Sequence, residues 1–440
     1  MKRKDEKKNI QSIIEERWNV LFPIANFRAG KDIIQYAGST FDAKEINAAL
    51  DVLLDGWFGL SNKATEFENN LAKYVEMKNG IVVNSGSSAN LLAITALKSL
   101  KLNKRLQNGD EIITQVSGFP TTINPIVQNN LVPVFVDVEL GSYNIDIKKI
   151  EPAISKKTKA IFIVHTLGNP VDMKPILEIA KKHNLFVIED CCDALGSEIY
   201  NKKVGSFGDI STFSFYPAHH ITMGEGGAVL SSNSTIARII RSLRDWGRDC
   251  FCAGETSMNK NGACGNRFDK WLPDLDEIID HKYVYSEIGY NLKPLELQCA
   301  MGLQQLRKLS DFIEKRNNNF MQYYKFFKNY EKFFILPKWH KKASPSWFAF
   351  PLSVRKDAPF KRFDLVDFLE NHKIQTRNLF AGNILLHPAY KHINYRQVGN
   401  FNNSDFVTTN TFFLGVYPGI NEKKMDYILA IIRKFFAKSQ

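Results

Sequence analysis

Apolar residues recur along the chain with two different periods, and the two alternate over most of its length. Short apolar runs bounded by Gly, Asn or Asp predict strands at 80–83, 111–116, 132–136, 160–164, 185–190, 212–215 and 228–230. Apolar residues spaced three or four apart predict helices between some of these runs, as at 42–54, 64–74, 91–100 and 173–183. Buried strands that alternate with helices favour an α/β fold with a mostly parallel central sheet covered by helices.

The pattern changes in the last third of the chain. A helix over 294–309 leads into helical sequence rich in Phe, Asn and Lys, followed by a strand-like run at 347–352 and helices near 364–372 and 422–438. This predicts a smaller C-terminal α+β lobe. We therefore expect an N-terminal helical segment (1–40), a large domain (41–310) and a small domain (311–440). Residues 1–8 mix basic and acidic side chains and are expected to form a solvated tail.

Composition narrows the classes of function. The chain has 440 residues, of which 44% are hydrophobic, and a net charge of +12, so a large globular core is expected. The positive charge suits a phosphorylated substrate, but no long single-sign block indicates nucleic-acid binding. No stretch has the length of a membrane span or the apolar core of a signal peptide, so we expect a cytoplasmic protein.

A turn rich in Gly and Ser follows the strand at 80–83. Gly86, Ser87 and Ser88 stand between that strand and the next helix. The start of a helix offers free N–H groups and a positive dipole end, and a glycine lets the backbone approach an anion. The turn therefore predicts a phosphate site, although a serine-rich helix cap without a ligand has the same pattern.

Six cysteines in a cytoplasmic protein favour metal binding or catalysis over disulfides. Cys250, Cys252 and Cys264 lie in one polar loop, and Cys192 follows a strand end. Four such thiolates suit zinc or an iron–sulfur cluster, and their spacing does not separate the two. Cys299 is expected to be an inert buried thiol, and strand alternation places Cys191 on the face opposite Cys192.

The segment Ser211–Gly227 carries a resemblance to a known family. Its Ser-Phe-Tyr-Pro-Ala-His and Gly-Glu-Gly-Gly sequences resemble the cofactor-attachment segment of the DegT/DnrJ/EryC1/StrS group of pyridoxal-phosphate (PLP) enzymes. In that pattern a lysine stands five residues after the serine, and here that position, counted from Ser214, is His219. An imidazole cannot form the stable Schiff base that a lysine forms with the cofactor aldehyde.

The resemblance implies an aspartate-aminotransferase-like (type I PLP) fold and a set of cofactor contacts. Asp190, at a strand end, would hold the pyridine nitrogen protonated, and Asp193 stands where the family usually has Gln or His. Phe119 would face the cofactor ring, with plain core packing as the alternative. Ser214 and residues 86–88 would hold the phosphate. Asn291 would reach the cofactor of a neighbouring subunit, which implies a homodimer.

Within the family, the chain resembles the 3-dehydrases of CDP-linked 4-keto-6-deoxyhexoses, which serve 3,6-dideoxyhexose and lipopolysaccharide O-antigen biosynthesis. This implies pyridoxamine 5'-phosphate (PMP) as cofactor, His219 as catalytic base, and a 2Fe–2S cluster on the four cysteines, supplied with electrons by a flavin/iron–sulfur reductase. Eleven residues separate Cys252 from Cys264 where the resemblance implies seven. Lys293 and Arg377 are further candidates for contacts with the diphosphate.

Three alternatives remain at this point. A cluster-free dehydratase of the same fold would take its amine from glutamate. A sugar aminotransferase would need another lysine in place of His219. A catalytically inactive PLP-fold binding protein would carry zinc on the cysteines.

Overall fold

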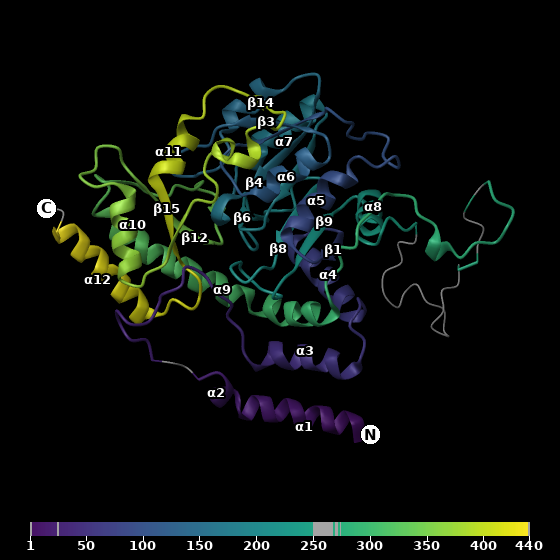
Figure 1. Ribbon diagram of the computed structural model, residues 1–440, viewed down its shortest axis with the longest axis horizontal. Coiled ribbons are helices and arrows are strands. Elements are labelled where there is room, and N and C mark those ends of the chain that lie inside the picture. The colour runs from purple at the N-terminus through teal and green to yellow at the C-terminus, as the bar shows by residue number, and fades with distance from the viewer. Residues whose placement is uncertain (1, 24–25, 250–266, 269–271, 273, 439–440) are drawn as a thin grey trace.

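The computed structural model describes residues 2–23, 26–249, 267–268, 272 and 274–438. Figure 1 shows a large lobe built on a central sheet, a smaller lobe that contains the C-terminus, and an N-terminal helix that lies outermost. The long helix α9 runs from beneath the large lobe to the small one. No described helix is long and apolar enough to cross a membrane.

The central sheet has eight strands in the order β1-β9-β8-β5-β4-β2-β3-β14. Every adjacent pair from β8 to β14 is parallel, while β9 is antiparallel to both of its neighbours. The predicted mostly parallel sheet is therefore confirmed. The strands are β1 (Asn79–Val83), β2 (Glu111–Gln115), β3 (Val132–Val136), β4 (Thr158–Val164), β5 (Phe186–Asp190), β8 (Ile210–Ser214), β9 (Gly227–Ser231) and β14 (Arg396–Gln397).

Helices cover both faces of this sheet, because successive strand residues point to opposite sides. Ile81 and Val83 pack in one core cluster with α5 and α8, whereas Val82 packs in another with α4 and α9. Helix α7 covers the rest of the second face. The helices of the large lobe are α3 (Ala43–Asp55), α4 (Asn62–Val75), α5 (Gly86–Ala96), α6 (Pro120–Gln128), α7 (Met173–His183) and α8 (Ser234–Arg244).

The small lobe packs helices on a second sheet with the order β10-β12-β15-β13. Its core is rich in aromatic side chains, among which Phe320 stacks on Trp347 with ring centroids 3.8 Å apart. Helix α9 (Glu296–Lys328) is continuous through residue 310, so the domain boundary expected there falls inside one helix. The other elements are β10 (Phe334–Ile335), β12 (Ala349–Val354), β13 (Thr376–Asn378), β15 (Thr411–Gly415), α10 (Arg362–Asn371), α11 (Asn402–Asn410) and α12 (Glu422–Lys438). A further small sheet joins β6 (Glu198–Ile199), β7 (Lys202–Lys203) and β11 (Ala343–Ser344).

Several predicted boundaries differ from the observed ones for local reasons. The helix expected at 91–100 begins at Gly86, because the Ser85 hydroxyl caps it by accepting the N–H of Ser88 at 3.1 Å. Residues 2–8, where a solvated tail is expected, are helical and belong to α1 (Lys2–Glu16), although most of their described side chains are exposed; α2 (Trp18–Leu21) follows. Lys7 pairs with Asp51 and Asp55 on α3, and this contact holds α1 against the large lobe.

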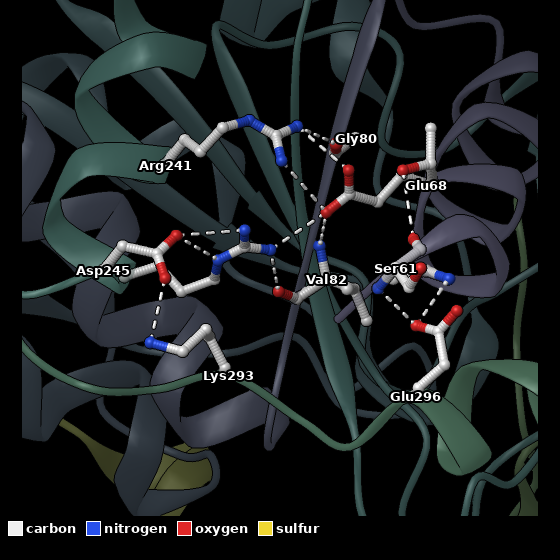
Figure 2. Close-up of polar contacts among 11 residues, drawn as sticks. Ser61, Glu68, Gly80, Val82, Arg241, Asp245, Lys293 and Glu296 are labelled. Atoms are coloured by element: carbon white, nitrogen blue, oxygen red, sulfur yellow. Dashed lines mark hydrogen bonds and ion pairs between the residues drawn. The ribbon is translucent and has the colours of Figure 1, made fainter. Parts of the chain in front are cut away.

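A buried ion-pair network connects α4, β1, α8 and the segment before α9 (Figure 2). Glu68 accepts from Arg241 at 2.9 Å and from Arg244 at 3.0 Å. Arg244 also binds Asp245 at 3.1 Å, and Asp245 binds Lys293 at 2.9 Å. The network therefore fixes residues 291–293 relative to the strand that precedes the Gly/Ser turn.

Candidate active site

A cavity of about 940 Å³ lies where several parallel strands of the central sheet end, and residues of the small lobe close its other side. Ligands of α/β sheets bind at the carboxyl ends of the strands, and this volume is in the usual range for such sites. It is lined by the turn Asn84–Ser87, by Asp190, Cys192 and Asp193 after β5, by Ser214 and His219 after β8, and by Arg377, Phe380 and Phe413 among others. No lysine is among the described residues that line it.

The Gly/Ser turn forms one end of this cavity. Gly86 and Ser87 line it at the start of α5, so the first N–H groups of that helix lie at the cavity wall. A Cβ atom at Gly86 would lie 2.5 Å from Ser214 Cβ and 3.1 Å from Cys192 Sγ, so only a glycine fits there. Ser88 has a different role from Gly86 and Ser87, because its hydroxyl donates to Asn84 at 2.6 Å and its N–H to Ser85.

Asp190 presents a carboxylate on the floor of the cavity. Its Oδ2 accepts from the Asn90 amide at 2.9 Å and from the Thr122 hydroxyl at 2.7 Å, and its Oδ1 accepts from the Cys192 N–H at 3.1 Å. Hydrogen bonds of this kind fix the direction in which the carboxylate points. The carboxylate is therefore suited to hold a proton on a ring nitrogen in the cavity.

His219 lies in the turn after β8 and faces the same cavity. Its ring packs against Phe348, with centroids 5.4 Å apart, and Asp193 Oδ1 lies 3.5 Å from its Nδ1. Burial, supplemented by the charge of Arg316, lowers the pKa of His219 to about 3. Burial, supplemented by the charge of Asp190, raises the pKa of Asp193 to about 8. Both shifts disfavour charge, and a neutral imidazole is the form that can accept a proton.

The remaining predicted residues fall in three groups. Phe119 and Arg377 line the cavity; Phe119 meets Phe380 edge-on, and Arg377 stacks over Tyr36 at 4.2 Å. Asn291 and Lys293 lie outside the cavity of their own chain, where Asn291 forms a β-bridge with Asp245. Cys250, Cys252 and Cys264 lie outside the described residues, whereas Cys192 lines the cavity.

The other described cysteines agree with expectation. Cys191 is buried in the cluster on the face opposite Cys192, and Cys299 is buried in the same cluster. Although Cys191 lies near His165 and Glu189, these two side chains are already bonded to each other at 3.1 Å. His165 Nδ1 accepts the N–H of Val171, and Glu189 accepts three backbone N–H groups. The group formed by His165, Glu189 and Cys191 therefore has a structural role.

Sequence reasoning missed Asn90, Thr122 and Arg316. Asn90 and Thr122 lie on α5 and α6, and α6 was not predicted as a helix. Arg316 is 1% exposed and follows the buried Phe312 by one helical turn. A charged residue within an apolar stripe was the available signal.

Comparison with known proteins identifies the family. The model of the DegT/DnrJ/EryC1/StrS aminotransferase family matches residues 39–433. The chain belongs to this family. It is 44% identical to the lipopolysaccharide biosynthesis protein RfbH of Salmonella typhimurium, covering 98% of each chain. It is 47% identical to a dTDP-4-dehydro-2,6-dideoxy-D-glucose 3-dehydratase of Saccharopolyspora spinosa, covering 94% of this chain and 88% of the relative.

A solved structure with the same fold is also similar to this chain. The GDP-4-keto-6-deoxy-D-mannose-3-dehydratase of E. coli, with bound hydrated PLP, superposes with a TM-score of 0.82 at 31% identity, covering 91% of this chain and 99% of that one. The aminotransferase-type fold expected from the sequence is therefore confirmed.

Proposed function

We propose that this protein is a dehydratase that removes the C3 hydroxyl of a nucleotide-linked 4-keto-6-deoxyhexose with the help of PMP/PLP. The proposal rests on His219. The cavity has the carboxylate of Asp190 and the Gly/Ser turn that suits a phosphate, but it is lined by this imidazole and, among the described residues, by no lysine. Relatives that are 47% and 31% identical are named as 3-dehydratases of nucleotide-linked sugars, which supports the same reaction class.

The cavity fits the proposed cofactor. Gly86 and Ser87 line the cavity at the start of α5, with Ser214 beside them, so a phosphate bound there would accept backbone N–H groups. Asp190 lies at the end of the neighbouring strand and can hold a pyridine nitrogen protonated. When bound, PMP supplies an amine that condenses with the C4 ketone and an electron-accepting ring. We further propose that Phe119 covers one face of that ring.

The residues of the chain then have distinct tasks. His219, held neutral by burial, takes a proton from the carbon next to the cofactor amine, and the hydroxyl leaves from C3 of the sugar. Asp193 can accept the Nδ1 hydrogen of His219 when the pair closes from 3.5 Å, which leaves Nε2 as the base. Arg377, supported by Tyr36 at the cavity wall, is suited to bind the diphosphate.

We propose that Cys192, Cys250, Cys252 and Cys264 hold a 2Fe–2S cluster, which would supply two electrons received from a flavin/iron–sulfur reductase. Replacement of the C3 hydroxyl by hydrogen is a two-electron reduction, and a cluster transfers electrons singly. Cys192 supports this source because its thiol lines the cofactor cavity. The second candidate is oxidation of glutamate without a cluster, which a relative solved with a trapped PLP–glutamate geminal diamine favours.

We propose CDP as the nucleotide and a homodimer in which Asn291 serves the partner's cofactor.

Two assays test these proposals. The protein loaded with PMP is incubated with 4-keto-6-deoxyhexoses linked to CDP, dTDP or GDP, and loss of the C3 oxygen is followed by mass spectrometry, with His219→Asn as the control that should keep only a residual rate. If none of the sugars loses the oxygen, or if the control removes it equally well, the proposed dehydratase activity is contradicted. Iron and sulfide are then measured per chain after purification without oxygen.

For the cluster, we expect about two irons and two sulfides per chain, as a 2Fe–2S centre requires. The Cys192→Ser variant should lose most of the iron, while Cys299→Ser, on the far face of the sheet, keeps it. Zinc alone, or no metal in the wild type, would reject the cluster, and glutamate-dependent turnover would then identify the second candidate.

A further inference from the structure

Arg316 on α9 connects two segments that meet at the candidate base. Its side chain is 1% exposed. Nη2 donates to the backbone carbonyl of His219 at 2.9 Å, and Nη1 donates to the carbonyl of Phe348 at 3.2 Å. These acceptors lie 97 and 32 residues away in sequence, so only the tertiary fold brings them to one guanidinium.

The two carbonyls belong to the two residues whose rings are in contact. The imidazole of His219 packs against the ring of Phe348, with centroids 5.4 Å apart. A guanidinium is planar and presents its N–H groups in a fixed fork, so it sets the distance between the two acceptors it binds. Arg316 therefore fixes the backbone of His219, the candidate base, and the backbone of Phe348, whose ring packs against the imidazole.

Stability alone is a poor explanation for Arg316. Among the described residues, no carboxylate forms an ion pair with it; the charge of Asp193 acts on it only from a greater distance, and its Nε has no hydrogen-bond partner. Burial lowers the pKa of Arg316 to about 10, which reflects the cost of keeping the cation out of water. The buried Arg244 is a contrast, because it has two carboxylate partners at 3.0 and 3.1 Å.

We propose that Arg316 is a positioning residue for His219, which holds the imidazole in the place from which it moves the proton in the proposed dehydration. The inference rests on the proposed function, because it takes His219 as the base. The packing behind the turn agrees: the cavity lined by His219, His220 and Arg316 has a volume of only about 10 Å³. A shorter or uncharged side chain would leave the two carbonyls without donors and free the turn to shift.

The charge of Arg316 acts on the same imidazole. After burial, it is the second cause that lowers the pKa of His219, so it favours the neutral imidazole and opposes its protonation. Asp193 Oδ1 faces the imidazole from the loop after β5, at 3.5 Å from Nδ1. The positioning role of Arg316 therefore rests on its two hydrogen bonds and not on its charge.

The test compares Arg316→Met and Arg316→Lys with a matched control, Arg396→Met. Arg396 binds Glu111 at 2.9 and 2.7 Å at the opposite end of the strands, away from the cavity. A displacement of the order of 1 Å in a catalytic group costs about 10²-fold, so we expect Arg316→Met to lower kcat by about that factor. The KM for the nucleotide sugar and the Kd for PMP should stay within about threefold of wild type, because binding contacts are untouched. Arg316→Lys keeps the charge but has a single nitrogen, so its kcat should be intermediate.

A double-variant cycle separates positioning from a general loss of structure. If Arg316 acts through His219, Arg316→Met has no further effect on the residual rate of C3 elimination that remains in a His219→Asn background, measured with enzyme in excess over the sugar. A full additional loss there, or a kcat within about threefold of wild type in the single variant, would overturn the proposal. Arg396→Met should lower the Tm with kcat unchanged; an equal loss of kcat in this control would also overturn it.

Crystal structures of wild type and Arg316→Met supply a readout that needs no turnover. A displaced or disordered imidazole at His219 in the variant supports the proposal, and an unmoved one rejects it. If the wild-type protein fails to dehydrate any of the sugars, the proposed function falls, while the structures still decide whether Arg316 places His219.

Discussion

Asn90 donates its side-chain amide to Asp190 Oδ2 at 2.9 Å, from the same helix that begins at the Gly/Ser turn. The Asn90 amide is itself oriented by the hydroxyl of Thr212, which donates to its oxygen at 2.6 Å. Helix α5 therefore provides the N–H groups at one end of the cavity and aims the carboxylate at the other. Helix α5 is rigid, so it sets the distance between these N–H groups and the Asp190 carboxylate.

Replacing Asp190 with Asn tests the role of this carboxylate. The variant keeps the shape of the side chain but removes the negative charge that would hold the pyridine nitrogen protonated. Loss of one preorganised electrostatic group typically costs about 10²–10³-fold in kcat, and we expect a loss of that size. The rate of C3 elimination is the measurement, with Thr122→Val, which removes a single hydrogen bond to the carboxylate, as a milder comparison. Equal rates in Asp190→Asn and wild type would contradict the role.

Gly86→Ala should weaken cofactor binding without unfolding the protein. The new methyl group would lie 2.5 Å from Ser214 Cβ, so it must displace Ser214, which lines the end of the cavity proposed for the phosphate. A fluorescence titration with PMP measures the Kd. Gly59→Ala is the matched control, because the atoms nearest to its new methyl group are 3.6 Å away. An unchanged Kd in Gly86→Ala would place the phosphate elsewhere.

His219→Lys should convert a free cofactor into a covalently held one. A lysine amine next to the ring captures the aldehyde of PLP as an imine, which borohydride reduction makes permanent. We expect mass spectrometry to find the reduced cofactor on residue 219, and C3 elimination to fall by about 10²–10⁴-fold, the usual contribution of a general base. The His219→Asn variant is the control and should lose the elimination without forming the adduct. Labelling of a different lysine would show that position 219 does not face the cofactor.

Glu68→Gln should destabilise the fold more than the loss of a surface charge does. Glu68 is 5% exposed and binds both Arg241 and Arg244, so its neutralisation leaves Arg241 without its carboxylate partner and Arg244 with Asp245 alone (Figure 2). Breaking a buried pair in this way costs about 3–5 kcal/mol in free energy of unfolding. Glu151→Gln, which breaks the exposed pair with Lys182, should cost far less, because solvent screens an exposed pair. Denaturant unfolding of the two variants measures the difference, and equal losses would contradict the argument.

The sequence alone determined the α/β fold and much of the candidate site. Strands with continuous apolar runs must be buried on both faces, which predicts a parallel sheet whose carboxyl ends meet at one edge. One such strand is followed by Gly86, and two others end at Asp190 and Ser214. The local sequence pattern therefore predicted that these residues line one cavity. His219 was recognisable because it stands where the family motif requires a lysine, and Cys250, Cys252 and Cys264 stay predictions.

Only the tertiary structure decided which side chains support that site. Asn90 and Thr122 reach Asp190 across 100 and 68 residues, and Arg316 reaches the His219 carbonyl across 97. Periodicity reports which face of an element is buried but not which element covers it, so the sequence marked Arg316 only as a charge in an apolar stripe. The same limit applies to α1. Its charged residues have the sequence pattern of a solvated tail, and only the tertiary structure shows that Lys7 pairs with α3.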